Sequence, residues 1–334
     1  MEPRLGIYIH IPFCKSKCGY CDFCSHPPAS AQEIERYLNA LLLHMQDFSA
    51  AAADYTVDTV YFGGGTPSFY GAARLIELLD AVKATGRLLK RAEVTVEVNP
   101  DSVRLHDLRA LHKAGFNRLS IGMQSANNNI LKMIGRRHSF HQVEMAVKNA
   151  RTAGFDNVSL DLIYGLPSQT RKDWADTLTK ALALKPAHIS CYGLQLEEGT
   201  PMYELKDSPL IPSDDEQADM YLCMVDELRR YGYEQYEISN FSIPGYESRH
   251  NLKYWQLQEY AGFGPGAHSD FGGVRYAYAK DLDAYIAAAR GGQFLFSENT
   301  AIPPRERDAE WIMLGARTVY GLDPKDYETR FRRR

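Results

Sequence analysis

The sequence predicts an α/β fold in which six successive β/α units build a parallel sheet, followed by a smaller α+β region. Three observations predict it. Strand-like and helix-like patterns alternate through the first two-thirds of the chain. Successive β/α units place their strands parallel, joined by right-handed crossovers. The alternation ends near residue 200. Six units are two short of a closed barrel, so an open six-unit barrel and a doubly wound sheet both fit the pattern.

The individual elements follow from periodicity and from cap residues. In the first strand Ile7, Ile9 and Ile11 share one face. Ser30 and Glu33 predict a capping box at the start of the first helix. The predicted strands span residues 7–11, 57–62, 93–98, 118–121, 158–163 and 188–194. The predicted helices span residues 31–45, 72–84, 105–114, 127–134, 141–153 and 172–184.

After residue 200 the pattern becomes mixed. Residues 208–213 contain two prolines and read as a linker. Residues 231–278 are rich in tyrosine and predict irregular structure or short strands. Further helices are expected at 214–230, 281–290 and 306–318. The predicted division is a core at 1–207, a second region at 208–302 and a final helical stretch at 303–334.

Composition excludes several classes of protein. Of the 334 residues, 45% are hydrophobic and 24% charged, as in an average globular protein, so a collagen-like or disordered chain is excluded. No apolar run approaches the roughly 20 residues that cross a bilayer. Lys and Arg total 38 against 42 Asp and Glu, so the basic excess typical of a nucleic-acid binder is missing. Six cysteines are too few for a disulfide scaffold, and a cytoplasmic, reducing location is expected.

The strongest signal is a cysteine cluster. Cys14, Cys18 and Cys21 follow the first strand with the spacing Cys-x-x-x-Cys-x-x-Cys. Three thiolates on one tight loop can hold three irons of a cubane cluster, which leaves the fourth iron open to a ligand with amino and carboxylate groups. A structural zinc site is the alternative, with Cys21 and Cys24 as one knuckle, but such a site needs four closed ligands.

The cysteine spacing, with Tyr20 before the third cysteine, resembles the signature of the radical S-adenosylmethionine (SAM) superfamily. The resemblance implies a partial (βα)6 barrel and a 4Fe–4S cluster on Cys14, Cys18 and Cys21. It implies that SAM binds the open iron and that one electron cleaves it to a 5′-deoxyadenosyl radical.

Residues at the carboxyl ends of the predicted strands suit SAM. Glycines after the second strand let the backbone approach the methionine amino group, although a tight turn explains them equally well. Carboxylates suit the ribose hydroxyls or the ammonium group, and an arginine suits the SAM carboxylate. The ordinary alternatives are a half-exposed strand residue for Glu97 and a solvated helix-end charge for Arg136. The residues that the resemblance assigns to SAM are Tyr8, Gly63, Gly64, Gly65, Thr66, Glu97, Gln124, Arg136 and Asp161.

Longer motifs resemble the coproporphyrinogen dehydrogenase class of radical SAM proteins. They are IYIHIPFC at 7–14, GGGTPS at 63–68, SIGMQS at 120–125 and DLIYGLP at 161–167, and the similarity reaches at least residue 266. This class contains an oxygen-independent dehydrogenase of haem synthesis and a haem chaperone. The dehydrogenase has an N-terminal arm and a fourth cysteine two residues after the third. Here that position is Phe23, Cys24 comes one residue later and reads as a bystander, and about five residues precede the first strand.

A second feature favours the chaperone. The segment HNLKYW at 250–255 resembles the chaperone's haem-associated motif. His250 can supply an axial imidazole and the aromatic residues a flat apolar surface, whereas an ordinary structural histidine is the alternative. His268 is a second candidate, better explained as a histidine that holds a glycine-rich turn.

The resemblance therefore implies a protein that binds haem and passes it to client haemoproteins. Its alternatives are a coproporphyrinogen III dehydrogenase, which decarboxylates propionates oxidatively, and another radical SAM modification such as methyl transfer. Whether SAM is cleaved productively is left open. The expected partners are haem, client haemoproteins and a reducing electron donor, with room for a homodimer and peripheral membrane contact, and without nucleic acid. Compared with the usual domain layout of this class, residues 303–334 are expected to be only the start of a helical C-terminal domain that is truncated.

Overall fold

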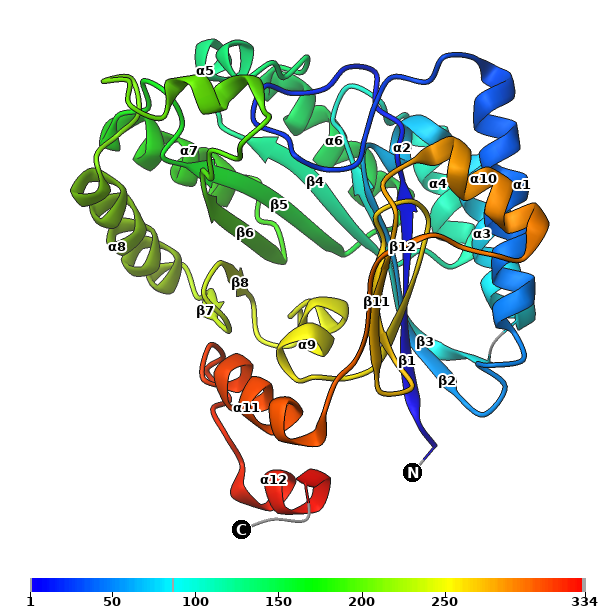
Figure 1. The fold of residues 1–334 in the computed structure, drawn as a ribbon. Helices are drawn as coiled ribbons and strands as arrows, with labels where there is room; N and C mark the ends of the chain where they lie inside the picture. Colours follow the sequence, from blue (N-terminus) through cyan, green and yellow to red (C-terminus); the bar gives the residue numbers. More distant parts are fainter. Residues whose placement is uncertain (1, 86, 332–334) are drawn as a thin grey trace.

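The computed structural model describes residues 2–85 and 87–331 (Figure 1). Its centre is six parallel strands that pair in sequence order. A doubly wound sheet reverses its strand order part-way, so this order confirms the partial barrel. The strands are β1 (Arg4–Ile11), β2 (Thr56–Gly64), β3 (Arg87–Val98), β4 (Arg118–Gln124), β5 (Asn157–Tyr164) and β6 (His188–Gly193).

Helices cover the outer face of these strands, as the crossovers between parallel strands require (Figure 1). Ser30 caps the first helix by accepting the Glu33 N–H at 3.2 Å. The Glu33 carboxylate accepts the Ala29 N–H at 2.6 Å, so the reciprocal bond of the expected capping box lies one residue earlier. The helices up to residue 230 are α1 (Ala31–Phe48), α2 (Pro67–Tyr70), α3 (Ala72–Thr85), α4 (Leu105–Ala114), α5 (Asn128–Met133), α6 (Phe140–Ala153), α7 (Arg171–Ala183), the 3-10 turn η1 (Pro201–Leu205) and α8 (Asp214–Arg230).

The C-terminal part extends the same sheet at both edges. At the β6 edge, β8 (Asn240–Ser242) pairs antiparallel with β6, and β7 (Glu234–Gln235) with β8. At the other edge, β9 (Tyr260–Phe263) is parallel to β1. Three antiparallel strands continue outward from it: β10 (His268–Phe271), β11 (Val274–Tyr278) and β12 (Phe296–Ala301). The described strands thus form one twelve-stranded mixed sheet that ends at β12 and β7 without closing.

Four further helices follow β8: α9 (Arg249–Trp255), α10 (Leu282–Gly291), α11 (Pro304–Gly315) and α12 (Pro324–Phe331). Because β8 and β9 lie on opposite sides of the open barrel, the segment between them crosses its opening, and Figure 1 shows α9 there. The tyrosine-rich stretch therefore holds short strands, as expected, and a helix that was not expected. The strand β12 is also not among the predicted elements, whereas α12 lies within the final helical stretch expected at 303–334.

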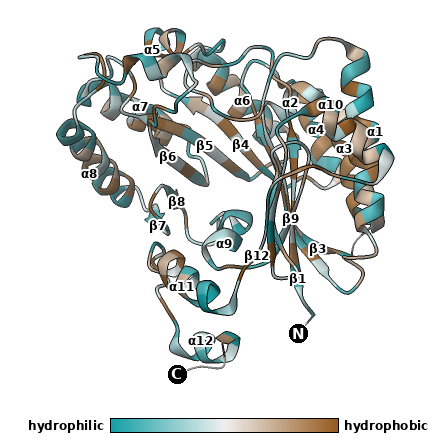
Figure 2. Ribbon diagram, in the orientation of Figure 1, coloured by the Kyte–Doolittle hydropathy of each residue, from teal (hydrophilic) through white to brown (hydrophobic). Residues whose placement is uncertain are grey.

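The strands of the barrel separate an apolar outer face from a polar inner face. In β4, Leu119, Ile121 and Met123 pack in the core beneath the helices, and in β5 Leu160 and Leu162 do the same. The alternate residues of these strands line the interior cavity, because successive side chains of a strand point to opposite faces. Figure 2 shows this as mixed brown and teal along the strands. None of the helices in the described parts of the chain is long and apolar enough to cross a membrane.

Candidate functional site

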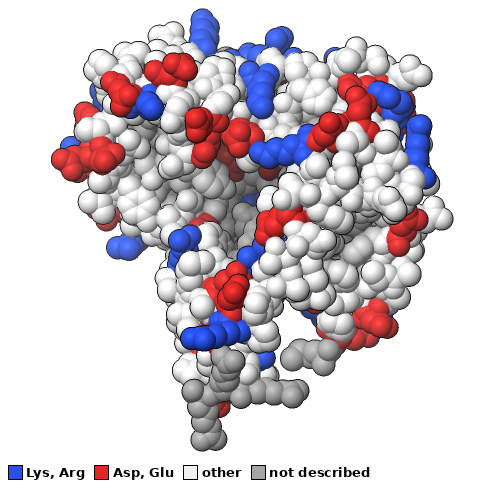
Figure 3. All heavy atoms as spheres, in the orientation of Figure 1, with Lys and Arg blue, Asp and Glu red and all other residues white. Residues whose placement is uncertain are grey.

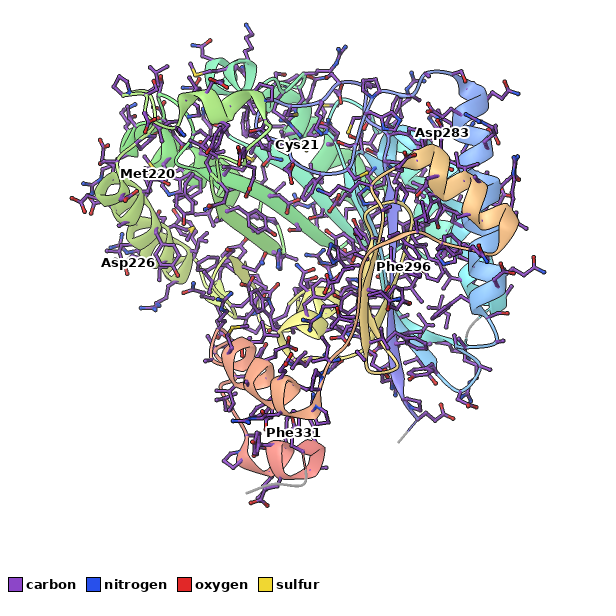
Figure 4. The ribbon with its side chains drawn as sticks, viewed as in Figure 1. Cys21, Met220, Asp226, Asp283, Phe296 and Phe331 are labelled. Carbon is purple, nitrogen blue, oxygen red and sulfur yellow. The ribbon has the colours of Figure 1, made fainter. Side chains whose placement is uncertain are left out.

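The three cysteines of the expected cluster motif face one cavity at the carboxyl ends of the barrel strands. Cys14, Cys18 and Cys21 all line it, and each is a free thiol. Figure 4 shows Cys21 near these strand ends. The two ends of the cysteine loop are hydrogen-bonded to each other. The Cys14 N–H donates to the His26 carbonyl at 3.0 Å, and the His26 N–H donates to the Pro12 carbonyl at 2.9 Å. The cavity has a volume of about 480 Å³.

The surroundings of the thiols disfavour their charged form unless a bound group offsets the charge. Burial raises the pKa of Cys14 and of Cys21, so these thiols stay protonated until something offsets the cost of their charge. The Thr66 hydroxyl donates to Cys14 Sγ at 3.3 Å. Among residues 2–85 and 87–331, no three His, Cys, Asp or Glu side chains are arranged to hold a single metal ion. A cubane differs from that geometry, because each cysteine binds a different iron.

The glycine run brings β2 against the cysteine loop. A Cβ at Gly65 would lie 2.8 Å from the Phe13 carbonyl oxygen, 2.9 Å from that of Ile11 and 3.0 Å from Cys14 Sγ. The Gly65 N–H itself donates to the Ile11 carbonyl at 2.7 Å. At Gly64 the backbone has φ +108°, which favours glycine. The run is therefore needed for the loop to sit over the strand end, and Gly64, Gly65 and Thr66 all line the cavity.

Two carboxylates project into the cavity from neighbouring parts of the barrel. Glu97 accepts from the Tyr61 hydroxyl at 2.9 Å and from the Gly64 N–H at 3.1 Å. Burial, followed by repulsion from Asp161, raises the pKa of Glu97 to about 7. Asp161 accepts from the Ser120 hydroxyl at 2.9 and 2.8 Å, and burial raises its pKa as well. Both groups gain from a ligand that brings donors or positive charge.

Arg136 closes the side of the cavity nearest the cysteines. Its Nη2 donates to the Gly122 carbonyl at 2.9 Å and to Asn99 Oδ1 at 3.3 Å. Its Nη1 lies 3.9 Å from Cys18 Sγ. The buried Nε atom has no hydrogen-bond partner among the described residues. Gln124, at the end of β4, has φ +61°, an unusual conformation that aims the end of this strand into the cavity.

Three of the expected site residues lie away from the cavity wall. Gly63 faces the Glu97 side chain, since a Cβ there would lie 3.1 Å from Glu97 Oε1. The Tyr8 hydroxyl pairs with His10 Nδ1 at 3.0 Å, and its ring stacks on Tyr61 at 6.2 Å. The third residue is His250, which lies deeper in the barrel.

His250 is 1% exposed in α9. Its Nδ1 pairs with the Thr59 hydroxyl at 2.8 Å, and its Nε2 with the Tyr254 hydroxyl at 2.9 Å. Its ring stacks on Tyr61 with centroids 5.3 Å apart. Burial lowers the pKa of His250 to about 3, so the imidazole is neutral, as an iron ligand must be, but both of its nitrogens are already engaged.

Sequence reasoning missed several residues of the cavity wall. Arg118 is 1% exposed and lies within electrostatic reach of Glu93 and Asp161. Arg118 and Ser120 share one face of β4 with Gly122 and Gln124, at every second position, and Ser190 and Tyr192 share one face of β6. This period of two was the available signal. The residues missed include Arg118, Ser120, Ile163, Ser190, Tyr192, Gln195, Glu197 and Asn251.

Comparison with known proteins identifies the family. The model of the radical SAM superfamily matches residues 8–181. A Bacillus subtilis protein named "Heme chaperone HemW" is 37% identical over 332 residues, which cover 98% of this chain and 86% of the relative. The Escherichia coli protein of that name is 39% identical over 266 residues, 80% of this chain and 70% of the relative. The chain belongs to the HemW family of radical SAM proteins.

The HemW-family chain shares its fold with a solved enzyme. The structure of the radical SAM enzyme coproporphyrinogen III oxidase (HemN) from Escherichia coli matches with a TM-score of 0.88 at 23% identity, covering 99% of this chain and 79% of that one. The likeness extends through the C-terminal strands as well as the barrel, so the whole mixed sheet is a shared architecture.

The cofactors of radical SAM proteins fit the residues present in this HemW-family chain. Three free thiols face one cavity, and Gly65 at the end of β2 leaves room for the cysteine loop to pass. The Nε of Arg136, which has no hydrogen-bond partner among the described residues, suits an anion. A 4Fe–4S cluster with SAM supplies one-electron cleavage of the sulfonium when both are bound. The thiols, two carboxylates and the arginine that line the cavity are the groups that would hold and orient them.

Proposed function

We propose that this protein binds haem and delivers it to client haemoproteins, and that a 4Fe–4S cluster and SAM occupy the cavity above the haem-associated helix. Membership of the HemW family supports the chaperone function, since close relatives carry the name "Heme chaperone HemW". The observation that carries the proposal is the position of the HNLKYW segment. It forms α9, and its Asn251 lines the floor of the cavity whose rim holds the cysteines.

We assign the cavity to SAM by the chemistry of its wall. Arg136 suits the carboxylate of the methionine part, and the strand end at Gly64 and Gly65 suits its amino group. Glu97 and Asp161 suit the ribose hydroxyls or the ammonium group, which would offset the raised pKa of each carboxyl. Tyr8 and Gly63 are assigned an indirect role in SAM binding. The Tyr8 ring packs against Tyr61, and Gly63 leaves room for the Glu97 side chain.

We assign haem to His250, which is 1% exposed and does not line the cavity, so α9 must move for haem to reach it. An iron ligand needs the lone pair of one imidazole nitrogen, so at least one of the bonds to Thr59 and Tyr254 must break. The neutral ring is ready to bind iron once released. The protein would act in the cytoplasm with a reducing electron donor, and its dimerisation and membrane contact would be features of haem delivery.

Anaerobic reconstitution followed by iron, sulfide and haem quantitation tests the cluster and the haem site together. We expect His250→Ala to weaken haem binding about tenfold or more, because the axial ligand is lost. His268→Ala is the matched control, since His268 is exposed on β10 and should be dispensable. Unchanged haem affinity in His250→Ala would remove the proposed haem site.

The alternative is a coproporphyrinogen III dehydrogenase, and the shared fold with HemN is the observation that favours it. Two residues of the cysteine loop argue for the chaperone instead. Phe23 lines the cavity where the dehydrogenase has its fourth cysteine. Cys24 Sγ donates to the Lys280 carbonyl at 3.2 Å and is not part of the cavity wall. Production of protoporphyrinogen by reconstituted protein would establish the enzyme and overturn the chaperone proposal.

A further inference from the structure

The helix α9 is held against the barrel by buried polar contacts. Glu93, on β3, accepts the backbone N–H of Arg249 at 3.0 Å and that of His250 at 2.9 Å. Lys253 Nζ lies 2.7 Å from Asp58 Oδ1, and the lysine is 1% exposed. A charged acceptor makes the stronger class of hydrogen bond, and Glu93 holds two of them. Release of His250 therefore requires several buried contacts to be given up together.

One polar connection runs from the cavity to α9 through Tyr61. The Tyr61 hydroxyl donates to Glu97 Oε1 at 2.9 Å, and Glu97 lines the cavity. On its other side the Tyr61 ring stacks on His250, with 5.3 Å between centroids and 29° between planes. The position of one phenol ring thus depends on the cavity carboxylate above it and on the haem-associated histidine below it.

A second connection runs from Asp161 through four hydrogen bonds. The Ser159 hydroxyl donates to Asp161 at 3.3 Å and pairs with His188 Nδ1 at 2.8 Å. His188 Nε2 pairs with the Tyr236 hydroxyl at 2.8 Å, and that hydroxyl accepts the Ser248 N–H at 3.2 Å. Ser248 is the N-cap of α9. Each member donates in the same direction, from α9 toward Asp161, if His188 is protonated on Nδ1, and such aligned chains strengthen one another.

We propose that Tyr61 couples the SAM pocket to α9, so that SAM and haem bind antagonistically although their sites are separate. The proposal rests on the proposed function in assigning haem to His250. SAM fixes Glu97 by donating to it, and Tyr61, which contacts both Glu97 and His250, then keeps α9 docked. The Asp161 connection ends at the N-cap of α9 and does not contact His250. Haem requires the buried His250 to leave Thr59 on β2, which undocks α9 and releases Tyr61. By linkage, each ligand weakens the other by the same factor.

Haem titration with and without SAM tests the coupling. The cluster is reconstituted anaerobically without reductant, so that SAM is not cleaved, and SAM is saturating for each variant. We expect SAM to raise the apparent haem Kd about fivefold or more in the unmodified protein. In Tyr61→Phe, which keeps the ring but loses its bond to Glu97, the ratio should fall below about twofold. Tyr233→Phe is the control, since it loses a buried bond to the Pro186 carbonyl far from the cavity.

Hydrogen exchange of residues 249–255 gives a readout that does not involve haem. SAM should slow exchange of α9 in the unmodified protein and in Tyr233→Phe, and should not slow it in Tyr61→Phe. Unchanged exchange and haem Kd on addition of SAM, or full coupling in Tyr61→Phe, would overturn the proposal. If SAM protects α9 but His250→Ala binds haem normally, the coupling stands and the haem assignment fails. If haem binding depends on His250 but ignores SAM, the coupling fails and the proposed function stands.

Discussion

Replacing Glu97 by glutamine should stabilise the cofactor-free protein in alkaline solution. Burial raises the pKa of Glu97 from 4.5 to about 7, so the folded chain binds a proton that the unfolded chain has released. Stability from this group is therefore fully present below pH 4.5 and is lost as the pH rises toward 7. At about 1.4 kcal/mol for each pH unit, the full loss is roughly 3 kcal/mol. Because Glu97 is only partly buried and lines the cavity, solvent screening reduces this loss, and about 2 kcal/mol is expected between pH 5 and pH 8.

Glutamine is neutral throughout and keeps the shape of the side chain, so it can accept from Gly64 and pair with the Tyr61 hydroxyl. We expect Glu97→Gln to match the unmodified protein near pH 5 and to exceed its free energy of unfolding by about 2 kcal/mol at pH 8. Reversible urea unfolding of the cofactor-free chain at both pH values measures this. Glu198→Gln is the matched control, because Glu198 is exposed. A stability difference that does not grow with pH, or a variant less stable at pH 8, would refute the argument.

Two other substitutions test the cysteine loop. Gly65→Ala should sharply reduce iron and sulfide incorporation, because its methyl group would clash with backbone on the facing loop, whereas Gly291→Ala, which has open space, should reconstitute normally. Normal cluster content in Gly65→Ala would contradict the proposed close approach. Cys24→Ser should keep the 4Fe–4S absorbance that Cys18→Ser loses, since Cys18 lines the cavity and Cys24 does not. Loss of the cluster in Cys24→Ser would make Cys24 a ligand instead of a bystander.

The barrel was predictable from the sequence because its signals are local. Strands such as β5 show runs of apolar and small residues, and each is followed by a helix with a clear apolar stripe. The cysteine spacing and the glycine run sit at strand ends, and parallel topology brings strand ends together. The cavity wall around Cys14, Gly65 and Glu97 follows from those facts alone.

The remaining features depend on contacts between distant segments. The strand β12 is almost wholly exposed and has no alternation, so only its pairing with β11 makes it a strand. The helix α9 is seven residues long and is fixed by Glu93, more than 150 residues earlier. The burial of His250 follows from that docking. A histidine flanked by aromatic residues looks the same in sequence whether it faces solvent or the barrel interior.

The pairing of β1 with β9 has a consequence for biogenesis. The strand that carries the cysteine loop is flanked by β2 on one side and by residues 260–263 on the other. At about 5–20 residues per second, roughly ten to fifty seconds of synthesis separate the two partners. During that time the edge of β1 is an open template for other strands. Loading of a cluster is therefore expected to follow the synthesis of residues 260–263, because the base of the cysteine loop is incomplete until then.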